Sequence, residues 1–108
     1  MNSALLETLN IVDWSSFHDQ CIEVFGFPSF YGRNINALID CLSYLTDNDG
    51  MTRFVLANDE QLVITIKDFV AFSANTPEIC SAFLEAIAFV NQRYLSSGEI
   101  ARLALVLA

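Results

Sequence analysis

The chain has 108 residues, of which 54% are hydrophobic, and a formal net charge of −8 from 13 acidic and 5 basic residues. This length and composition predict one domain, residues 1–108, whose core needs neither disulfides nor a structural metal. The acidity disfavours direct binding of nucleic acid or anionic membranes, and it favours a basic protein partner. An acidic surface also serves solubility alone, and the charge by itself does not separate these two interpretations.

The N-terminal residues contain no basic segment ahead of an apolar run, so we expect no signal peptide, and no apolar stretch reaches the length of a membrane span. The three cysteines, Cys21, Cys41 and Cys80, are odd in number and form no C-x-x-C pair. We expect reduced thiols that pack as small apolar side chains, with no metal and no cofactor. These features predict a cytoplasmic protein.

The first expected elements are an ambiguous apolar segment and a capped helix. Residues 5–12 fit a strand or a helix equally well. Asp13, or one of the two serines at 15 and 16, offers an N-cap for a helix that runs to about Phe25. Gly26 then supplies the left-handed cap that ends this helix.

A loop beginning at Pro28 leads to a second helix over residues 35–45, for which Asn34 is a good N-cap. Residues three and four apart lie side by side on a helix, which gives this one two faces. The apolar face carries Ile35, Leu38, Leu42 and Leu45. The other face carries Asn36, Ile39, Asp40 and Ser43. We predict that the first face packs into the core and that the second presents a polar patch with one carboxylate.

The middle of the chain is predicted as a turn followed by a hairpin. Residues 46–50 are rich in Asp, Asn and Gly and form the turn. Residues 53–57 and 62–66 have strand-like composition, and the polar residues between them indicate a hairpin. A short helix is expected over residues 68–74.

The last third is predicted as a long helix and a strand. Thr76, Pro77 and Glu78 mark a strong helix start. A core stripe follows at helical spacing: Cys80, Phe83, Ile87, Val90 and Tyr94. Residues 101–107 form an apolar run interrupted only by Arg102, which indicates a buried strand at the heart of a sheet. The fold predicted from these elements is a small α/β layered domain with a short, mainly parallel sheet packed by helices, to which the hairpin would add a strand.

A catalytic interpretation has little support. His18 is the only histidine. Ser15 and Ser16 precede it and Asp19 follows it on one helix, where adjacent residues do not face each other. The glycines are isolated, so the sequence has no phosphate-binding loop, and it has no cluster of metal-ligating residues. We predict that the protein is not an enzyme; a small enzyme that uses His18 is the weakest of the alternatives.

Two features point to a protein interface. Phe30 and Tyr31 precede the second helix, and Ile39 lies beside Asp40 on its polar face. Aromatic and apolar anchors next to a charge are typical of interface centres. Phe89, off the stripe of the long helix, covers a further wall of the core or extends an exposed patch.

Residues 28–42, the loop and the second helix, carry a specific order of residues: an aromatic pair and glycine, then asparagine, alanine–leucine and aspartate–cysteine–leucine. The residues concerned are Pro28, Tyr31, Gly32, Asn34, Ala37, Leu38, Asp40, Cys41 and Leu42, with Phe17 and His18 upstream. This pattern, and the order of the expected elements, resembles the barstar family, intracellular inhibitors of barnase-type ribonucleases.

The resemblance implies that the second helix and the loop before it plug a nuclease active site. Asp40 matches the family's principal carboxylate, which replaces a substrate phosphate among the enzyme's basic residues. The partner-binding residues expected on this basis are Phe30, Tyr31, Arg33, Asn34, Asn36, Ile39, Asp40 and Ser43. The expected protein is a monomer until it binds a basic nuclease toxin, as an immunity protein or antitoxin would.

The chain departs from the family's best-known pattern at contact positions. Asn36 replaces an acid, Ile39 replaces a tryptophan, Phe30 lacks a hydroxyl, and Arg33 reverses a charge. The family's contact acid on the long helix has no clear counterpart, residues 91–92 being nearest. Changes at central contacts alter specificity most, so we expect a target other than barnase. The sequence leaves open whether that target is a ribonuclease or a deoxyribonuclease, and whether the module binds another protein without inhibiting a nuclease.

Overall fold

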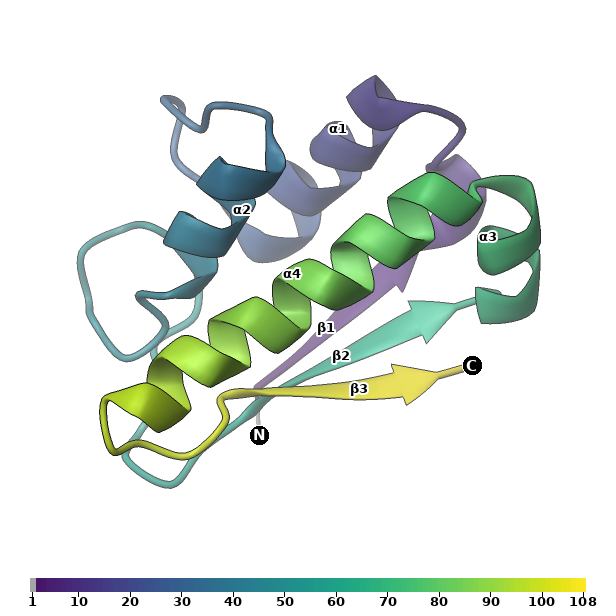
Figure 1. Ribbon diagram of the computed structural model, residues 1–108. Helices are drawn as coiled ribbons and strands as arrows, with labels where there is room; N and C mark the ends of the chain where they lie inside the picture. The colour runs from purple at the N-terminus through teal and green to yellow at the C-terminus, as the bar shows by residue number, and fades with distance from the viewer. Residues whose placement is uncertain (1) are drawn as a thin grey trace.

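The computed structural model describes residues 2–108 as a parallel sheet of three strands with helices over one face (Figure 1). The elements in order are β1 (Asn2–Glu7), the 3-10 helix η1 (Thr8–Asn10), α1 (Trp14–Phe25), α2 (Ile35–Leu42), β2 (Leu62–Lys67), α3 (Phe69–Asn75), α4 (Pro77–Ser96) and β3 (Leu103–Leu107). The ambiguous residues 5–12 thus divide between the end of β1 and η1. The predicted small α/β fold is confirmed.

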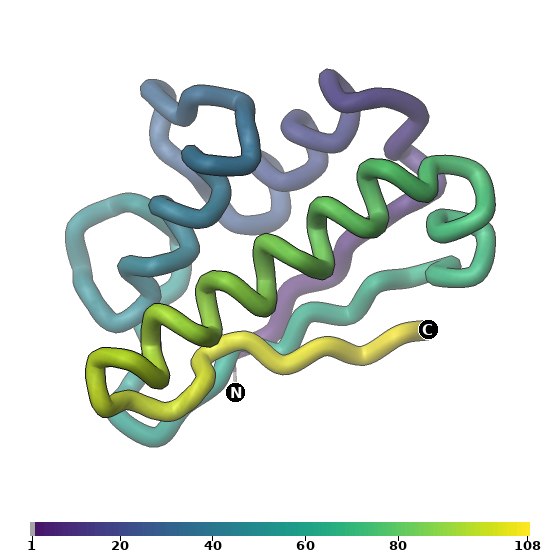
Figure 2. The backbone as a smooth tube through the Cα atoms, viewed as in Figure 1, coloured from purple at the N-terminus to yellow at the C-terminus, as the bar shows by residue number. Residues whose placement is uncertain are grey.

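The strands are parallel, in the order β1-β2-β3, with Ala4 paired to Ile64 and Ile64 paired to Leu105. Side chains alternate between the two faces of the sheet. Leu6 and Ile64 on the helix-covered face are fully buried, whereas Leu5 on the other face is exposed. The backbone trace shows the chain beginning and ending at opposite ends of the sheet (Figure 2).

The predicted boundaries of α1 are confirmed. The Asp13 carboxylate accepts a hydrogen bond from the Ser16 backbone N–H at 2.8 Å, and the Ser16 hydroxyl accepts one from the Asp13 N–H at 3.0 Å. This capping box satisfies two backbone donors at the helix start. Gly26 ends the helix in the left-handed region with φ of 67°.

The expected strand over residues 53–57 is wrong, and so is the hairpin. This segment pairs with the end of α1 and with the turn after α2 instead of a strand: Arg53 N–H donates to the Phe25 carbonyl at 2.9 Å, and Leu56 N–H donates to the Leu45 carbonyl at 2.7 Å. Phe54 and Leu56 are buried while Val55 is exposed. The strand-like composition therefore belongs to an extended segment that packs one side on the helices.

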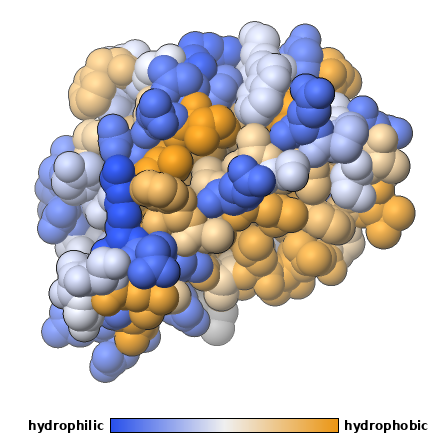
Figure 3. All heavy atoms as spheres, viewed as in Figure 1, coloured by the Kyte–Doolittle hydropathy of each residue, from blue (hydrophilic) through white to orange (hydrophobic). Residues whose placement is uncertain are grey.

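The last strand also lies elsewhere than expected. β3 begins at Leu103 and forms an edge of the sheet, whereas β2 is the central strand. Val106 is 46% exposed, and hydrophobic side chains over β3 are visible from outside (Figure 3). The run of apolar residues misled the prediction because the uncovered face of this strand is apolar as well.

The long helix α4 buries every residue of its predicted stripe, from Cys80 to Tyr94. Its start is confirmed, with Pro77 in the first turn, although the Thr76 hydroxyl donates back to the Phe72 carbonyl at 3.0 Å instead of capping α4. The three cysteines are free and buried. Within residues 2–108, every helix is too short or too polar to cross a membrane.

Candidate protein-binding site

Helix α2 is fixed to the body of the protein along its predicted apolar face. Leu38, Leu42 and Leu45 are fully buried, and the Asn34 side chain accepts a hydrogen bond from the Ala37 N–H at 2.8 Å at the helix start. The regular helix ends at Leu42, earlier than the sequence suggested, and tighter turns carry the chain on to Leu45. The opposite face of α2 is left toward solvent.

The Tyr94 side chain of α4 holds the end of α2. Its hydroxyl donates to the Leu42 carbonyl at 2.8 Å and accepts from the Leu45 N–H at 3.0 Å. Burial raises the pKa of Tyr94 to about 12, so the hydroxyl keeps its proton and its donor role at neutral pH. These contacts give α2 a defined position on α4.

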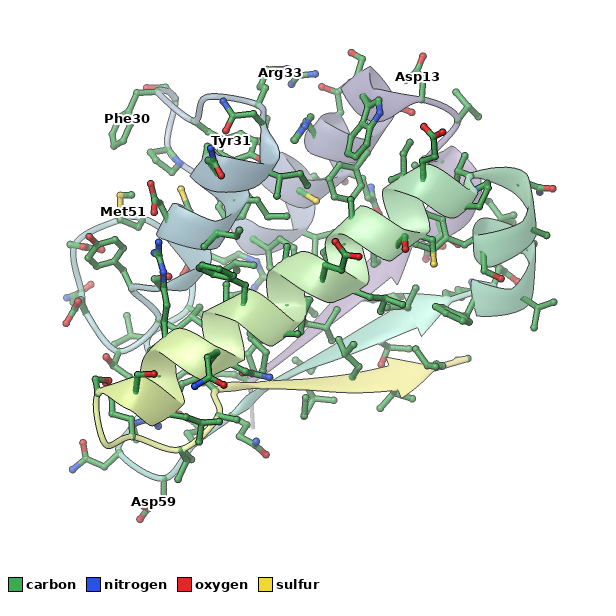
Figure 4. The ribbon with its side chains drawn as sticks, in the orientation of Figure 1. Asp13, Phe30, Tyr31, Arg33, Met51 and Asp59 are labelled. Atoms are coloured by element: carbon green, nitrogen blue, oxygen red, sulfur yellow. The ribbon has the colours of Figure 1, made fainter. Side chains whose placement is uncertain are left out.

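The two aromatic residues of the preceding loop have opposite environments. Phe30 is 73% exposed and points away from the body of the protein (Figure 4), whereas Tyr31 is only 7% exposed. The Tyr31 ring lies 4.6 Å from that of Phe27, and its hydroxyl is 2.8 Å from Nδ1 of His18. Tyr31 therefore supports the loop from inside, and Phe30 is the aromatic side chain available to a partner.

His18 is part of this support. It is buried, and burial followed by the nearby Arg33 charge lowers its pKa, which favours the neutral ring. The side chains of Ser15 and Asp19 bind Arg33 rather than the histidine. With Trp14 and Ile35, His18 lines a shallow hollow of about 380 Å³. Its hydrogen bond to Tyr31 gives it a structural role in the loop.

Arg33 joins the loop to α1 (Figure 4). Its guanidinium is 2.8 Å from the Asp19 carboxylate and donates to the Ser15 carbonyl at 2.9 Å. Arg33 has a positive φ of 53°, a backbone conformation that is uncommon for residues other than glycine, asparagine or aspartate. The expected contact residue is thus exposed but engaged within the chain.

The polar face of α2 contains the other expected residues. Asn36 and Asp40 are exposed, and Ile39 and Ser43 are partly buried. The Ser43 hydroxyl donates to the Ile39 carbonyl at 2.7 Å. This is a rigid surface on which Asp40 is the central charge.

A residue that the sequence did not indicate completes this surface. Nη1 of Arg93, on α4, lies 3.1 Å from Oδ1 of Asp40 and 3.2 Å from the Ser43 hydroxyl. Its guanidinium also lies 5.4 Å from the ring centre of Phe89, one turn earlier on α4. Phe89 is 55% exposed, so it extends the exposed patch and does not line the core.

The exposed residues of this surface have the character of a binding site. Among residues 2–108, no group of three or more His, Cys, Asp or Glu side chains could hold a metal ion. The only histidine, His18, is hydrogen-bonded to the Tyr31 hydroxyl through Nδ1. What the site offers is a carboxylate, an arginine and exposed aromatic side chains on one rigid surface, the composition expected of a protein interface.

The family described as Barstar (barnase inhibitor) matches residues 1–106. No curated protein matches the chain.

Proposed function

The chain belongs to the barstar family, and we propose that it inhibits a basic ribonuclease by closing the active site with the loop and helix of residues 30–44. The observation that carries this proposal is the position of Asp40. Its side chain is 62% exposed at the centre of a helix face whose other side is fully buried. A carboxylate presented in this way can take the place of an RNA phosphate among basic groups through charge-assisted hydrogen bonds.

The inhibitor needs no chemical step, because it acts by presenting a rigid surface to the enzyme. The Asn34 cap fixes one end of α2 and the Tyr94 hydroxyl fixes the other. A partner therefore binds a surface that is already ordered, and little conformational entropy is lost on association. The net charge of −8 accelerates the encounter with a basic enzyme.

The expected target is a nuclease toxin other than barnase, against which the protein acts as a cytoplasmic immunity protein. Asn36 and Ile39 support this part of the proposal, since they change the charge and shape beside Asp40. Phe30 provides an exposed aromatic anchor at the loop tip, where it can enter a pocket of the enzyme.

The test is inhibition of a panel of purified barnase-type ribonucleases, measured with a fluorogenic RNA substrate. We expect stoichiometric inhibition of at least one enzyme. Replacing Asp40→Asn leaves the enzyme's basic groups buried without a counter-charge, which costs about 3–5 kcal/mol or more than about 100-fold in affinity.

The matched control is Asp59→Asn, because it changes the net charge equally and lies far from the loop tip marked by Phe30 (Figure 4). It should alter inhibition by less than about threefold, as a distant surface charge affects mainly the encounter rate. Equal inhibition by the Asp40 variant and the native chain would contradict the role of Asp40. Failure to inhibit any panel enzyme would favour a binding module without nuclease inhibition.

A further inference from the structure

The Asp40 carboxylate is not free in the unbound protein, because it is paired within the chain. We call the four residues Asp40, Ser43, Phe89 and Arg93 the mixed-charge patch. Arg93 contacts all the others: Asp40 at 3.1 Å, the Ser43 hydroxyl at 3.2 Å and the Phe89 ring at 5.4 Å. The Arg93 side chain is 47% exposed and that of Asp40 is 62% exposed, so a partner can reach both.

The Asp40–Arg93 pair contributes little to holding the fold. An exposed ion pair is screened by water and adds little to stability. Helix α2 is attached to α4 by the buried contacts of Tyr94 and by its own buried leucines. The consequence of the ion pair is therefore felt mainly by a molecule that binds there.

For such a molecule, the positive charge of Arg93 offsets part of the attraction between Asp40 and a cation. A cation placed against Asp40 lies within a few ångströms of the Arg93 guanidinium and is repelled by it. A partner that presents only cations, as a phosphate-binding site does, meets a locally neutral surface. A partner with a cation and a carboxylate side by side can satisfy both charges.

We propose that Arg93 determines specificity: the nuclease that this protein inhibits presents a carboxylate to Arg93 next to the basic group that it presents to Asp40. The proposal rests on the inhibitor function argued above. Arg93 is one of 5 basic residues in a chain of net charge −8, and it is the one that touches the central carboxylate.

The surface around Arg93 also has room for the partner. A hollow of about 470 Å³ lies beside it on α4, lined by Phe89, Gln92, Arg93, Ser96 and Ser97. Its lining combines an aromatic ring with hydroxyl and amide groups, which suits a carboxylate side chain whose methylene groups pack on Phe89. Contacts with Ser43 and Phe89 hold the guanidinium in place before binding, so the partner meets an ordered donor.

The experiment compares Arg93→Met with Lys67→Met on two enzymes: barnase, and the panel ribonuclease that the native chain inhibits most strongly. Both changes remove one positive charge, but Lys67 lies on β2 and its 3.7 Å contact is with Glu7 of β1. We expect Arg93→Met to bind barnase at least about tenfold more tightly and the panel enzyme at least about tenfold more weakly. Lys67→Met should change both affinities by less than about threefold.

Each result has a distinct meaning. If Asp40→Asn abolishes inhibition while Arg93→Met shifts both enzymes in the same direction, or no more than Lys67→Met does, the role of Arg93 is refuted and the inhibitor function stands. No gain of barnase affinity in Arg93→Met, or strongest inhibition of barnase by the native chain, also refutes it. If Asp40→Asn leaves inhibition unchanged, the proposed function itself fails. Unfolding curves of both methionine variants should match the native curve, which excludes a folding defect.

Discussion

Replacing Tyr94→Phe tests how firmly α2 is held against α4. The change removes one buried hydroxyl and leaves the apolar ring, so it creates no large cavity. It leaves the Leu42 carbonyl and the Leu45 N–H without the partners they have at 2.8 Å and 3.0 Å. A buried polar group that loses its partner costs about 1–3 kcal/mol. With two such groups and partial relaxation of the turn, we expect a loss of about 2–4 kcal/mol in the free energy of unfolding.

The assay is urea-induced unfolding followed by far-UV circular dichroism. For a domain of this size, the slope of the free energy against urea is about 1–3 kcal/mol per molar. The unfolding midpoint should therefore fall by about 1–2 M, with an unchanged slope. The control is Tyr44→Phe, whose ring is exposed, and it should stay within about 0.5 kcal/mol of the native protein.

A loss below about 0.5 kcal/mol in Tyr94→Phe would refute this reasoning, since it would mean that water or a backbone shift satisfies both groups at little cost. A loss in the expected range has a consequence for binding. Ser43 and Asp40 lie within one turn of the residues that the hydroxyl holds, so inhibition of a panel ribonuclease should weaken along with stability.

Two further predictions concern pH and the end of α1. Burial raises the pKa of Tyr94 from 10.0 to about 12 and also raises that of Tyr31, so the folded protein holds these protons more tightly than the unfolded chain. The stability that this contributes is complete below pH 10 and is lost as the pH rises toward 12; urea midpoints measured from pH 8 to 12 should fall, and fall less steeply in Tyr94→Phe. Replacing Gly26→Ala should destabilise by more than about 1 kcal/mol, because φ is 67° and a Cβ would lie 2.8 Å from Cβ of Arg53. Thermal unfolding of Gly50→Ala, where φ is 83° and no atom lies within 4 Å, should show a smaller loss, and equal losses would contradict the steric explanation.

The elements predicted well from the sequence are those fixed by local contacts. The Asp13 cap and the Gly26 end of α1 depend on neighbours within four residues, and the stripe of α4 repeats with the helical period. The strand predicted over residues 53–57 was wrong because a strand and an isolated extended segment have similar composition. The two differ in their hydrogen-bond partners, which here are the distant carbonyls of Phe25 and Leu45.

The position of a strand within its sheet is equally nonlocal. The apolar run before the C-terminus predicts a central strand, yet β2 is the central strand and β3 lies at the edge. An edge strand can be as apolar as a central one when a face of the sheet is left uncovered, as Leu5 and Val106 show here.

The candidate site follows the same division. The two faces of α2 could be predicted because its periodicity is local, and the burial of Leu38 and Leu42 agrees. The difference between Phe30 and Tyr31 could not, since it depends on a hydrogen bond to His18 in the preceding helix. The Arg93 contact joins residues 53 positions apart, and no sequence spacing indicates it.

The proposed complex divides its electrostatics between two length scales. The net charge of −8 acts over about a Debye length, roughly 10 Å at 0.1 M salt, and attracts any basic protein. At that distance Asp40 and Arg93, 3.1 Å apart, act as a neutral pair. Only at contact does a partner distinguish the separate positions of the negative and the positive charge. The net charge of the protein therefore governs how fast basic proteins associate with it. The positions of Asp40 and Arg93 govern which of those proteins stays bound.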